Sequence, residues 1–469
     1  MRDIERLLAE ECSGVRAEEW IDKTDPADDS PVVRIPVASA EAISGAVRTA
    51  RAASRDWART APADRAAAVD RAADGLSAYQ EELAWLTKRE MGRPLDEARA
   101  GVAAGIATLR QYAQLGPAHR GRSLAGAWSA TDLMVPEPRG VAAVITPWND
   151  PVAVSCGLIG AALVTGNTVV YKPSERTPAT GWLLHQLIAE ELPEGVLTLV
   201  NGGAEVGDRL VREPLDVIAH VGSTATGLGI RRATTTKVVR ENGGNDPLLV
   251  DEDVDPAWAA EQAAIGAFAN SGQICVAVER IYVHERIAAS FLAELVKRAE
   301  ALDLAPLVDR RLRDEVHSQV AEAIAAGAAV QCGGEIPAGP GAFYPATVLA
   351  GCTEQMRLMR EETFGPVAPV SVVSSFSEGL TRAADGAYGL AATVLTGSLR
   401  HAQEAWRELP VGTVKVNSVF GGAPAGAAHP RGASGDGYGY GPELLDEFTA
   451  TKVVHWEAPP VPQPAPQAG

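Results

Sequence analysis

Cysteine is scarce and scattered in this chain. None of the cysteines forms a CxxC pair, and their odd number cannot close into a complete set of disulfides. No Cys or His pair stands at ligand spacing, so no metal site is predicted. A reducing compartment, the cytoplasm, is the simplest expectation. The five are Cys12, Cys156, Cys275, Cys332 and Cys352.

Long apolar runs and an excess of basic residues are also absent. No stretch reaches the roughly 18 uninterrupted apolar residues of a membrane span, and the charged start MRDIERLLAEEC lacks the apolar core of a secretory signal. The formal net charge of -18 argues against nucleic acid or membrane as a partner, since both bind basic surfaces. The 469 residues, 46% hydrophobic and 22% charged, predict a globular protein of two or three domains.

Short apolar, β-branched runs alternate with helical patterns through the middle of the chain. The first hundred residues read mostly as helix, with Ser39 as an N-cap, and residues 119–137 as an extended excursion. Strands are predicted within the segments 140–146, 166–174, 195–203, 217–223 and 236–242. A second alternating block follows from about 244 to 435. This order predicts α/β architecture with an open, largely parallel sheet able to carry a nucleotide.

Three residues near predicted strand or helix ends are candidates for chemistry. Cys275 follows a Gly–Gln pair where nearby amides can stabilise a thiolate, although a lone cysteine among apolar neighbours is more often core filler. Glu241, before Gly243 and Gly244, can act as a general base or be a solvated loop residue. Asn149, in TPWN, can donate to a developing oxyanion or belong to a tight turn.

Glycine pairs and polar residues at other strand ends suit a dinucleotide. The segment VNGGAEVGDRL (200–210) is a variant glycine-rich turn without the strict GxGxxG. Ser223 stands at a second strand end, where a pyrophosphate can bind. Lys172 and Glu175 follow a third strand and can hold ribose hydroxyls. Because a carboxylate repels a 2′-phosphate, Glu175 favours NAD, with NADP still possible.

Taken together, these motifs resemble the aldehyde dehydrogenase superfamily. TPWN, KPSE, GST, E-x-G-G, GQ-x-C and EETFGP occur in the order and approximate spacing of that family, from about residue 30 to 455. The resemblance implies a Rossmann-like NAD-binding domain (1–118 and 139–243) and an α/β catalytic domain (244–442). It also implies a small β oligomerisation segment (119–138 and 443–458), and hence a homodimer or homotetramer. A disordered Pro-rich tail is expected at 459–469.

The resemblance also implies roles for individual residues. Cys275 looks like the nucleophile, Glu241 like the base for the deacylating water, and Asn149 like part of the oxyanion hole. An aldehyde would be oxidised to an acid through a thiohemiacetal and a thioester. The cofactor-binding residues would be Ile145, Thr146, Trp148, Lys172, Ser174, Glu175, Gly203, Gly207, Ser223, Glu362 and Phe364, and the substrate tunnel would include Asp150, Gly157, Ile274 and Phe420.

Several positions depart from the family pattern. Asp150 replaces the usual bulky residue after the asparagine, and Leu158 stands where a lysine thought to serve a proton relay is usual. Gly157 replaces a large residue, which can widen the tunnel. The segment 421–443 is rewritten and includes His429 and Arg431. If Asp150 points into the tunnel, it disfavours anionic aldehydes and favours a neutral or amino-bearing, fairly bulky one; alternatively it is turned away and salt-bridged.

Two other functions compete with hydrolytic aldehyde oxidation. A coenzyme A-acylating dehydrogenase shares most motifs, but its members usually lack a carboxylate at the position of Glu241. A non-catalytic structural protein on the same fold should have lost the nucleophile or the cofactor residues, which this chain retains.

Overall fold

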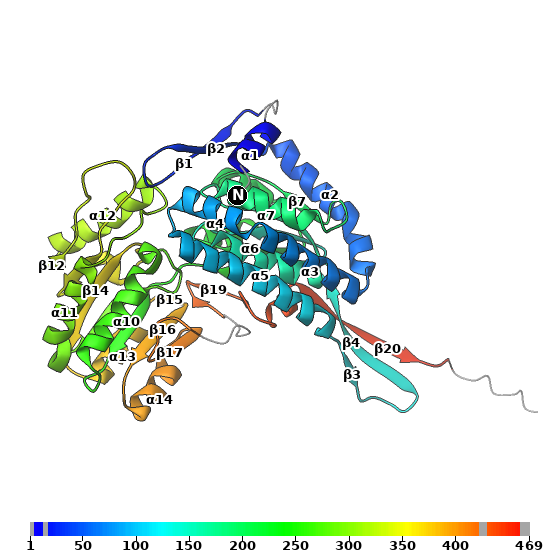
Figure 1. Cartoon of the computed structure of the whole chain (residues 1–469). Coiled ribbons are helices and arrows are strands. Elements are labelled where there is room, and N and C mark those ends of the chain that lie inside the picture. Colours follow the sequence, from blue (N-terminus) through cyan, green and yellow to red (C-terminus); the bar gives the residue numbers. More distant parts are fainter. Residues whose placement is uncertain (1–3, 13–16, 422–428, 460–469) are drawn as a thin grey trace, which may run out of the picture.

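Two largely parallel β-sheets organise the chain, which a computed structural model describes over residues 4–12, 17–421 and 429–459. Six strands form one sheet, in the order β19-β9-β8-β5-β6-β7. Seven form the other, in the order β12-β13-β14-β11-β10-β16-β17. Helices lie beside both sheets, and the two sheets occupy separate lobes (Figure 1). The predicted α/β fold class is confirmed.

The six-stranded sheet comes from the first alternating block. All residues of its central strands β5, β6 and β8 are buried, which explains why those strands read as unbroken apolar runs. Its strands are β5 (Val141–Ile145), β6 (Thr168–Lys172), β7 (Leu197–Leu199), β8 (Val217–Val221), β9 (Lys237–Glu241) and the short antiparallel β19 (Gly435–Asp436). Its crossover helices are α6 (Pro151–Val164), α7 (Pro178–Ala189), α8 (Ala204–Leu210) and α9 (Thr224–Ala233).

Amino-terminal helices cover this sheet, as the pattern of the first hundred residues predicts. The Ser39 side chain accepts a hydrogen bond from the Ala42 N–H at the start of α2, and α4 ends at Gly92 in a left-handed conformation (φ 82°). The elements are α1 (Ile4–Cys12), β1 (Trp20–Thr24), β2 (Pro31–Pro36), α2 (Ala40–Arg59), α3 (Pro62–Ala78), α4 (Gln80–Met91) and α5 (Leu95–Ala118). β1 and β2 form a separate antiparallel pair.

The seven-stranded sheet is parallel except for its edge strand β12. Its strands are β10 (Asp246–Val250), β11 (Val278–His284), β12 (Ala329–Cys332), β13 (Thr347–Ala350), β14 (Val367–Val373), β16 (Ala391–Leu395) and β17 (Thr413–Val416). The accompanying helices are α10 (Pro256–Phe268), η1 (Ala269–Gly272), α11 (Glu285–Glu300), α12 (Arg310–Ala325), η2 (Arg357–Met359), α13 (Phe376–Ala384) and α14 (Leu399–Glu408). A small two-stranded sheet pairs β15 (Tyr388–Gly389) with β18 (Arg431–Gly432).

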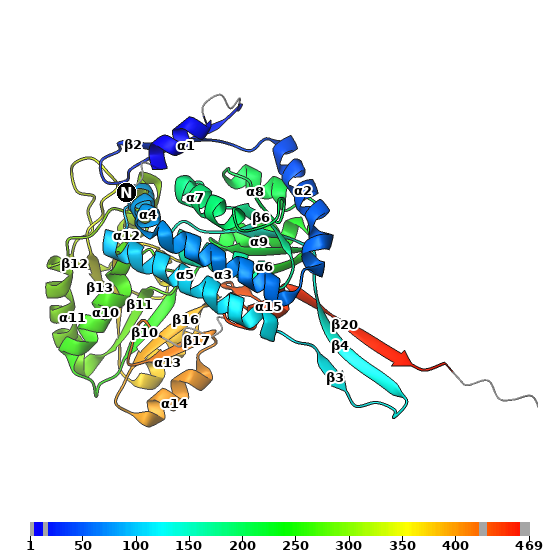
Figure 2. The same ribbon diagram turned by 45° about the vertical axis from the view of Figure 1, so that its right-hand side comes forward.

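A three-stranded antiparallel arm projects from the body of the molecule (Figures 1 and 2). It consists of β3 (Arg122–Leu124), β4 (Ala130–Pro138) and β20 (Thr449–Glu457), and the short helix α15 (Leu444–Glu447) precedes β20. β4 and β20 pair along their whole length. Trp128 and Trp456 lie exposed on this arm. Its two predicted parts therefore come together, and its role in oligomerisation stays a prediction.

The predicted domain limits likewise remain predictions, with one local difference. Residues 435–436 were expected in the catalytic domain, but β19 pairs with β9 in the six-stranded sheet. Of the predicted tail at 459–469, residues 460–469 lie outside the described part of the chain, as do residues 422–428 of the rewritten segment. Within the described ranges, no helix is both long and apolar enough to cross a membrane, and no cluster of three or more His, Cys, Asp or Glu side chains could hold a metal ion.

Candidate active site

The candidate residues converge where strands of the six-stranded sheet reach their carboxyl ends. Asn149 follows β5, Lys172 ends β6, Ser223 follows β8 and Glu241 ends β9. In open parallel sheets this edge is where ligands bind, because the loops that leave neighbouring strands form a crevice there. The loop that carries Cys275 comes from the second lobe and meets the same edge.

An unusual backbone turn delivers Cys275 to this edge. After α10 the chain passes through η1, where Asn270, Ser271 and Gly272 all have positive φ (47°, 54° and 76°). A side chain at Gly272 would collide with the carbonyl oxygen of Gly365, so only glycine fits there. The Gln273 side chain anchors the turn, since its Nε2 donates to the Asn270 carbonyl at 2.9 Å. Cys275 emerges half-buried from this fixed loop.

The thiol of Cys275 and the carboxylate of Glu241 face each other. Cys275 Sγ donates a hydrogen bond to Glu241 Oε1 at 3.8 Å. Burial raises the pKa of Glu241, and the bond from Cys275 partly offsets that rise. The pKa of Cys275 lies well above its usual value because of burial, followed by the charges of Glu241, Asp246 and Glu362. A thiol beside a carboxylate of raised pKa is an arrangement that can serve as a nucleophile and its base.

Asn149 completes this group from the other side of the crevice. Its Nδ2 donates to the Gln273 carbonyl at 3.2 Å, so the amide points at the loop that carries Cys275. The second N–H of that amide is available to another acceptor. The structure thus brings Cys275, Glu241 and Asn149 together, as the sequence predicts.

A cavity of about 490 Å³ opens beside the triad, at the ends of β5, β6 and β8. Space above Gly203 and Gly229 is open, with no atom within 4 Å of a Cβ built on either glycine. Burial lowers the pKa of Lys172, whose Nζ donates to the Pro173 carbonyl at 3.1 Å, while Glu175 raises it. Nine of the eleven predicted cofactor residues line this cavity: Ile145, Thr146, Trp148, Lys172, Ser174, Glu175, Gly203, Gly207 and Ser223.

The other two, Glu362 and Phe364, do not line this cavity, but they contact Gly244 and the cavity residue Trp148 respectively. Glu362 Oε1 accepts from the Gly244 N–H at 2.9 Å, and its carboxylate occupies the space that a side chain on Gly243 would need. Phe364 has a positive φ of 54° and contacts the Trp148 ring edge-on, with centroids 5.4 Å apart. Burial and the neighbouring Glu279 raise the pKa of Glu362.

These features are matched by the comparisons with known proteins. The model of the aldehyde dehydrogenase family matches residues 14–454. The chain belongs to this family. A mitochondrial aldehyde dehydrogenase of Leishmania tarentolae is 33% identical over 94% of this chain and 92% of its own length.

Solved aldehyde dehydrogenase structures have the same fold. Lactaldehyde dehydrogenase from Escherichia coli superposes with a TM-score of 0.92 at 30% identity, covering 95% of this chain and 97% of that one. An NAD+ complex of aldehyde dehydrogenase from Bacillus cereus superposes with a TM-score of 0.91 at 31% identity, covering 94% and 93%. The resemblance inferred from the motifs is confirmed.

Within this aldehyde dehydrogenase, the structure favours one of the two alternatives for Asp150 and differs from the expectation for Gly157. Asp150 Oδ1 forms a salt bridge with Arg93 Nη1 at 3.1 Å, so its charge is compensated rather than presented alone to substrate. Gly157 does not leave open space, because a Cβ there would lie 3.1 Å from the Tyr440 ring. Tyr440 is in turn hydrogen-bonded to Thr108. The ion-paired reading of Asp150 is the one that the geometry favours.

The remaining tunnel candidates lie on loops of the second lobe. Ile274 directly precedes Cys275 and accepts from the Ala277 N–H at 2.9 Å, which closes the turn around the nucleophile. The half-buried Phe420 lies beneath the Lys415 ammonium, 5.5 Å from Nζ to the ring centroid.

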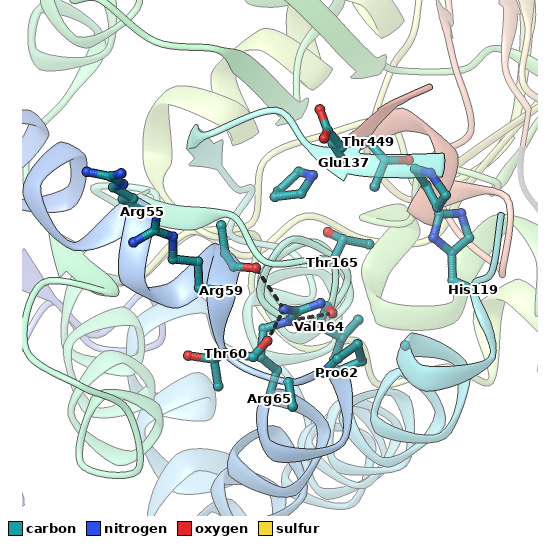
Figure 3. A pocket seen from close by; sticks show the side chains of 15 residues that line it. Arg55, Arg59, Thr60, Pro62, Arg65, His119, Glu137, Val164, Thr165 and Thr449 are labelled. Atoms are coloured by element: carbon teal, nitrogen blue, oxygen red, sulfur yellow. Dashed lines mark hydrogen bonds between the residues drawn. The ribbon is translucent and has the colours of Figure 1, made fainter. Parts of the chain in front are cut away.

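A second cavity, of about 540 Å³, lies away from this site, where α2, α3 and α5 meet the base of the arm (Figure 3). Arg55 and Arg59 line one side and His119 the other. The buried Arg65 donates from Nε to the Val164 carbonyl at 3.1 Å and from Nη1 to the Thr60 carbonyl. These bonds tie the start of α3 to the end of α6, so Arg65 serves the fold.

Several residues of the site escaped sequence reasoning. Glu279 accepts from the N–H groups of Thr363 and Phe364 at 2.9 and 2.8 Å and fixes the strained loop. Arg176, directly after the KPSE motif, lies over the Trp148 ring at 5.2 Å. Lys415 had a signal, since a lysine in the apolar strand TVKV is unusual for a buried sheet. Glu279 had a similar one, because it belongs to a fully buried strand.

Proposed function

We propose that this aldehyde dehydrogenase oxidises an aldehyde to a carboxylic acid with NAD+, using Cys275 as nucleophile and Glu241 as base. The observation that carries the proposal is the Cys275–Glu241 contact at 3.8 Å, at the same edge of the six-stranded sheet as the 490 Å³ cavity. Hydride transfer from a thiohemiacetal needs a hydride acceptor close to Cys275, and a cavity at the same edge supports this arrangement.

The cavity residues suit a dinucleotide. Lys172 supplies a buried cation, Glu175 can accept ribose hydroxyls, and the open space above Gly203 lets a phosphate approach the backbone. Glu362, whose charge acts on the Cys275 thiol, would hold the nicotinamide ribose. NAD+ bound here would supply the hydride acceptor. The similarity to an NAD+ complex supports the same assignment.

The protein's own residues account for the remaining chemistry. Glu241 accepts the Sγ proton of Cys275, and the thiolate adds to the carbonyl carbon to give a thiohemiacetal. The Asn149 amide and the Cys275 N–H stabilise the oxyanion, each donor contributing on the order of 3 kcal/mol. Loss of hydride leaves a thioester on Cys275. Glu241 next releases the proton that it took from Sγ to solvent. As a carboxylate again, it takes a proton from water, whose oxygen attacks the thioester; the acid and the Cys275 thiolate are released, and Glu241 returns the proton to the thiolate.

We propose a neutral aldehyde as the preferred substrate class. The Arg93–Asp150 pair presents no net charge, which removes the earlier reason for an amino-bearing substrate. The Tyr440 ring beside Gly157 also removes the reason for expecting an unusually wide tunnel. Matched neutral, cationic and anionic aldehydes of equal length test this, and a kcat/KM highest for either charged member would refute it.

Replacement of Cys275 by Ala tests the function itself. NADH formation should disappear while NAD+ binding, followed by quenching of tryptophan fluorescence, persists. Cys332→Ala removes another half-buried thiol, far along the chain, and should leave turnover unchanged. Turnover retained in Cys275→Ala would contradict the proposal. Analysis of products with and without coenzyme A separates hydrolysis from acyl transfer: free acid in both samples is expected.

We further propose that the arm of β3, β4 and β20 joins copies of the chain into a homodimer or homotetramer. The exposed Trp128, Val453 and Trp456 on this arm support the assignment, because large apolar side chains on a projecting sheet favour burial against a partner. Light scattering during size-exclusion chromatography should give two or four chain masses. A single chain mass would overturn it.

A further inference from the structure

A lysine in the second lobe lies behind the nucleophile. Leu248, Thr393 and Lys415 form one row across the neighbouring strands β10, β16 and β17. Side chains in such a row point to the same face of a sheet. Leu248 packs in the apolar cluster that contains α10, the helix that leads into the Cys275 loop. Lys415 therefore extends on the side of the sheet from which Cys275 is presented.

The ammonium group of Lys415 is held close to the predicted tunnel. Its Nζ donates to the Val419 carbonyl at 2.8 Å and lies 5.5 Å from the centroid of the Phe420 ring. The side chain is half-buried, and one backbone carbonyl does not use all three ammonium donors. A cation kept in this place costs desolvation energy, which its neighbours must offset.

Asp246 provides part of that compensation. It is 4% exposed, its Oδ1 accepts from the Ala391 N–H at 3.2 Å, and its Oδ2 has no hydrogen-bond partner among the described residues. A Cβ built on Gly244 would lie 2.7 Å from Asp246 Oδ1 and 2.8 Å from the Cys275 carbonyl oxygen, so the carboxylate and the Cys275 backbone both lie close to Gly244. Burial lowers the pKa of Lys415, while the charges of Asp246 and Cys275 raise it.

The other charges around Cys275 are negative and destabilise a thiolate. Glu241, Asp246 and Glu362 all act on the thiol, and each raises its pKa in addition to burial. Lys415 acts in the opposite direction. In α6, Leu158 is 2% exposed and brings no charge to the site.

We propose that Lys415 is the positioning residue whose positive charge stabilises the Cys275 thiolate in this enzyme. The inference rests on the proposed function of Cys275 and adds a residue from β17 to it. The proton leaves Sγ for Glu241, and Lys415 lowers the energy of the anion that remains. Asp246 in turn keeps Lys415 protonated.

The rate of Cys275 alkylation by iodoacetamide, measured between pH 6 and 10 on the full chain without aldehyde, tests the proposal. Peptide mass spectrometry assigns the label to Cys275. In Lys415→Met the midpoint of the alkylation profile should move to higher pH by about one unit, and the rate at neutral pH should fall about tenfold. Lys415→Arg should keep the midpoint. Lys297→Met, which removes an exposed lysine, is the matched control and should also keep it.

Lys415→Gln covers the case in which the methionine variant does not fold, since it can still donate to the Val419 carbonyl. Thermal unfolding and NAD+ binding identify the folded variants. An unchanged midpoint in a folded, neutral variant overturns the inference, as does an arginine variant that behaves like the neutral ones. A failure of this inference can be told apart from a failure of the proposed function, because alkylation needs no turnover and Cys275→Ala tests turnover alone.

Discussion

Replacement of Glu241 by Gln separates the two halves of the proposed reaction. In the structure, Cys275 Sγ lies 3.8 Å from Glu241 Oε1. The variant keeps an oxygen that can accept a hydrogen bond from Sγ, but it loses the base. A positioned general base contributes about 10² to 10⁴ in rate, which corresponds to about 3 to 5 kcal/mol. A thiol loses its proton to solvent far more readily than water does, so loss of the base slows deacylation more than it slows thiolate formation. Stopped-flow NADH absorbance should therefore show a burst near one NADH per active site, followed by a steady rate lower by that factor.

The pH dependence follows from the same carboxyl. Because burial raises the pKa of Glu241 above 4.5, the fraction of active base grows as pH rises through that higher range. The steady rate of the wild-type enzyme should increase there, and this limb should vanish in Glu241→Gln. Glu205→Gln, on the exposed face of α8, is the control. An unaltered steady rate in Glu241→Gln, or a burst lost altogether in a folded variant that binds NAD+, would refute the assignment.

Protein stability gives a second readout of the raised pKa. A carboxyl with a higher pKa in the folded state than in the unfolded state destabilises the folded state once the pH exceeds the unfolded-state pKa. The loss of stability has its full size above the folded-state pKa. Glu241→Gln should therefore melt at a higher temperature than the wild type at neutral pH. The two melting temperatures should converge at pH 4, where both side chains are neutral.

Three further changes test the scaffold and the cofactor site. Arg65→Ala leaves backbone carbonyls of α2 and α6 without their hydrogen-bond donor, and it should lower the free energy of unfolding by about 3 kcal/mol in urea titrations. Arg59→Ala, at an exposed position, should change that free energy little. Gly272→Ala meets the Gly365 carbonyl at a positive φ and should cost at least about 2 kcal/mol as well as turnover, measured by melting and NADH formation. Glu175→Gln should raise kcat/KM with NADP relative to NAD by about tenfold, because a carboxylate that repels a 2′-phosphate is lost; an unchanged ratio would contradict that role.

The fold and the catalytic group were accessible from sequence for a local reason. Buried parallel strands read as short apolar runs, and functional residues follow directly at their ends, as Asn149 follows β5 and Glu241 ends β9. Because parallel strands bring their carboxyl ends to one edge, the order of such motifs predicts that they meet. The Cys275 loop belonged to the other lobe, and only the combined motif order connected it to this edge.

The tunnel wall could not be predicted, because its contacts join segments that no local pattern links. The charge of Asp150 is compensated by Arg93, which precedes α5, and the space beside Gly157 is filled by Tyr440 from the rewritten segment. Considered without its neighbours, the aspartate indicates a free charge in the tunnel and the glycine indicates an empty volume. The actual effect of each residue depends on the side chain that tertiary packing places beside it, and the sequence does not show which side chain that is.

The same reasoning bears on the lysine that the family pattern expects at Leu158. Electrostatic stabilisation of a thiolate depends on the distance and burial of a cation, and it does not depend on the element that carries the cation. Lys415 approaches Cys275 from β17 in the second lobe, and its pKa responds to Cys275 and Asp246. Under the proposal above, Lys415 gives the Cys275 thiolate a compensating charge although α6 carries an apolar residue at position 158.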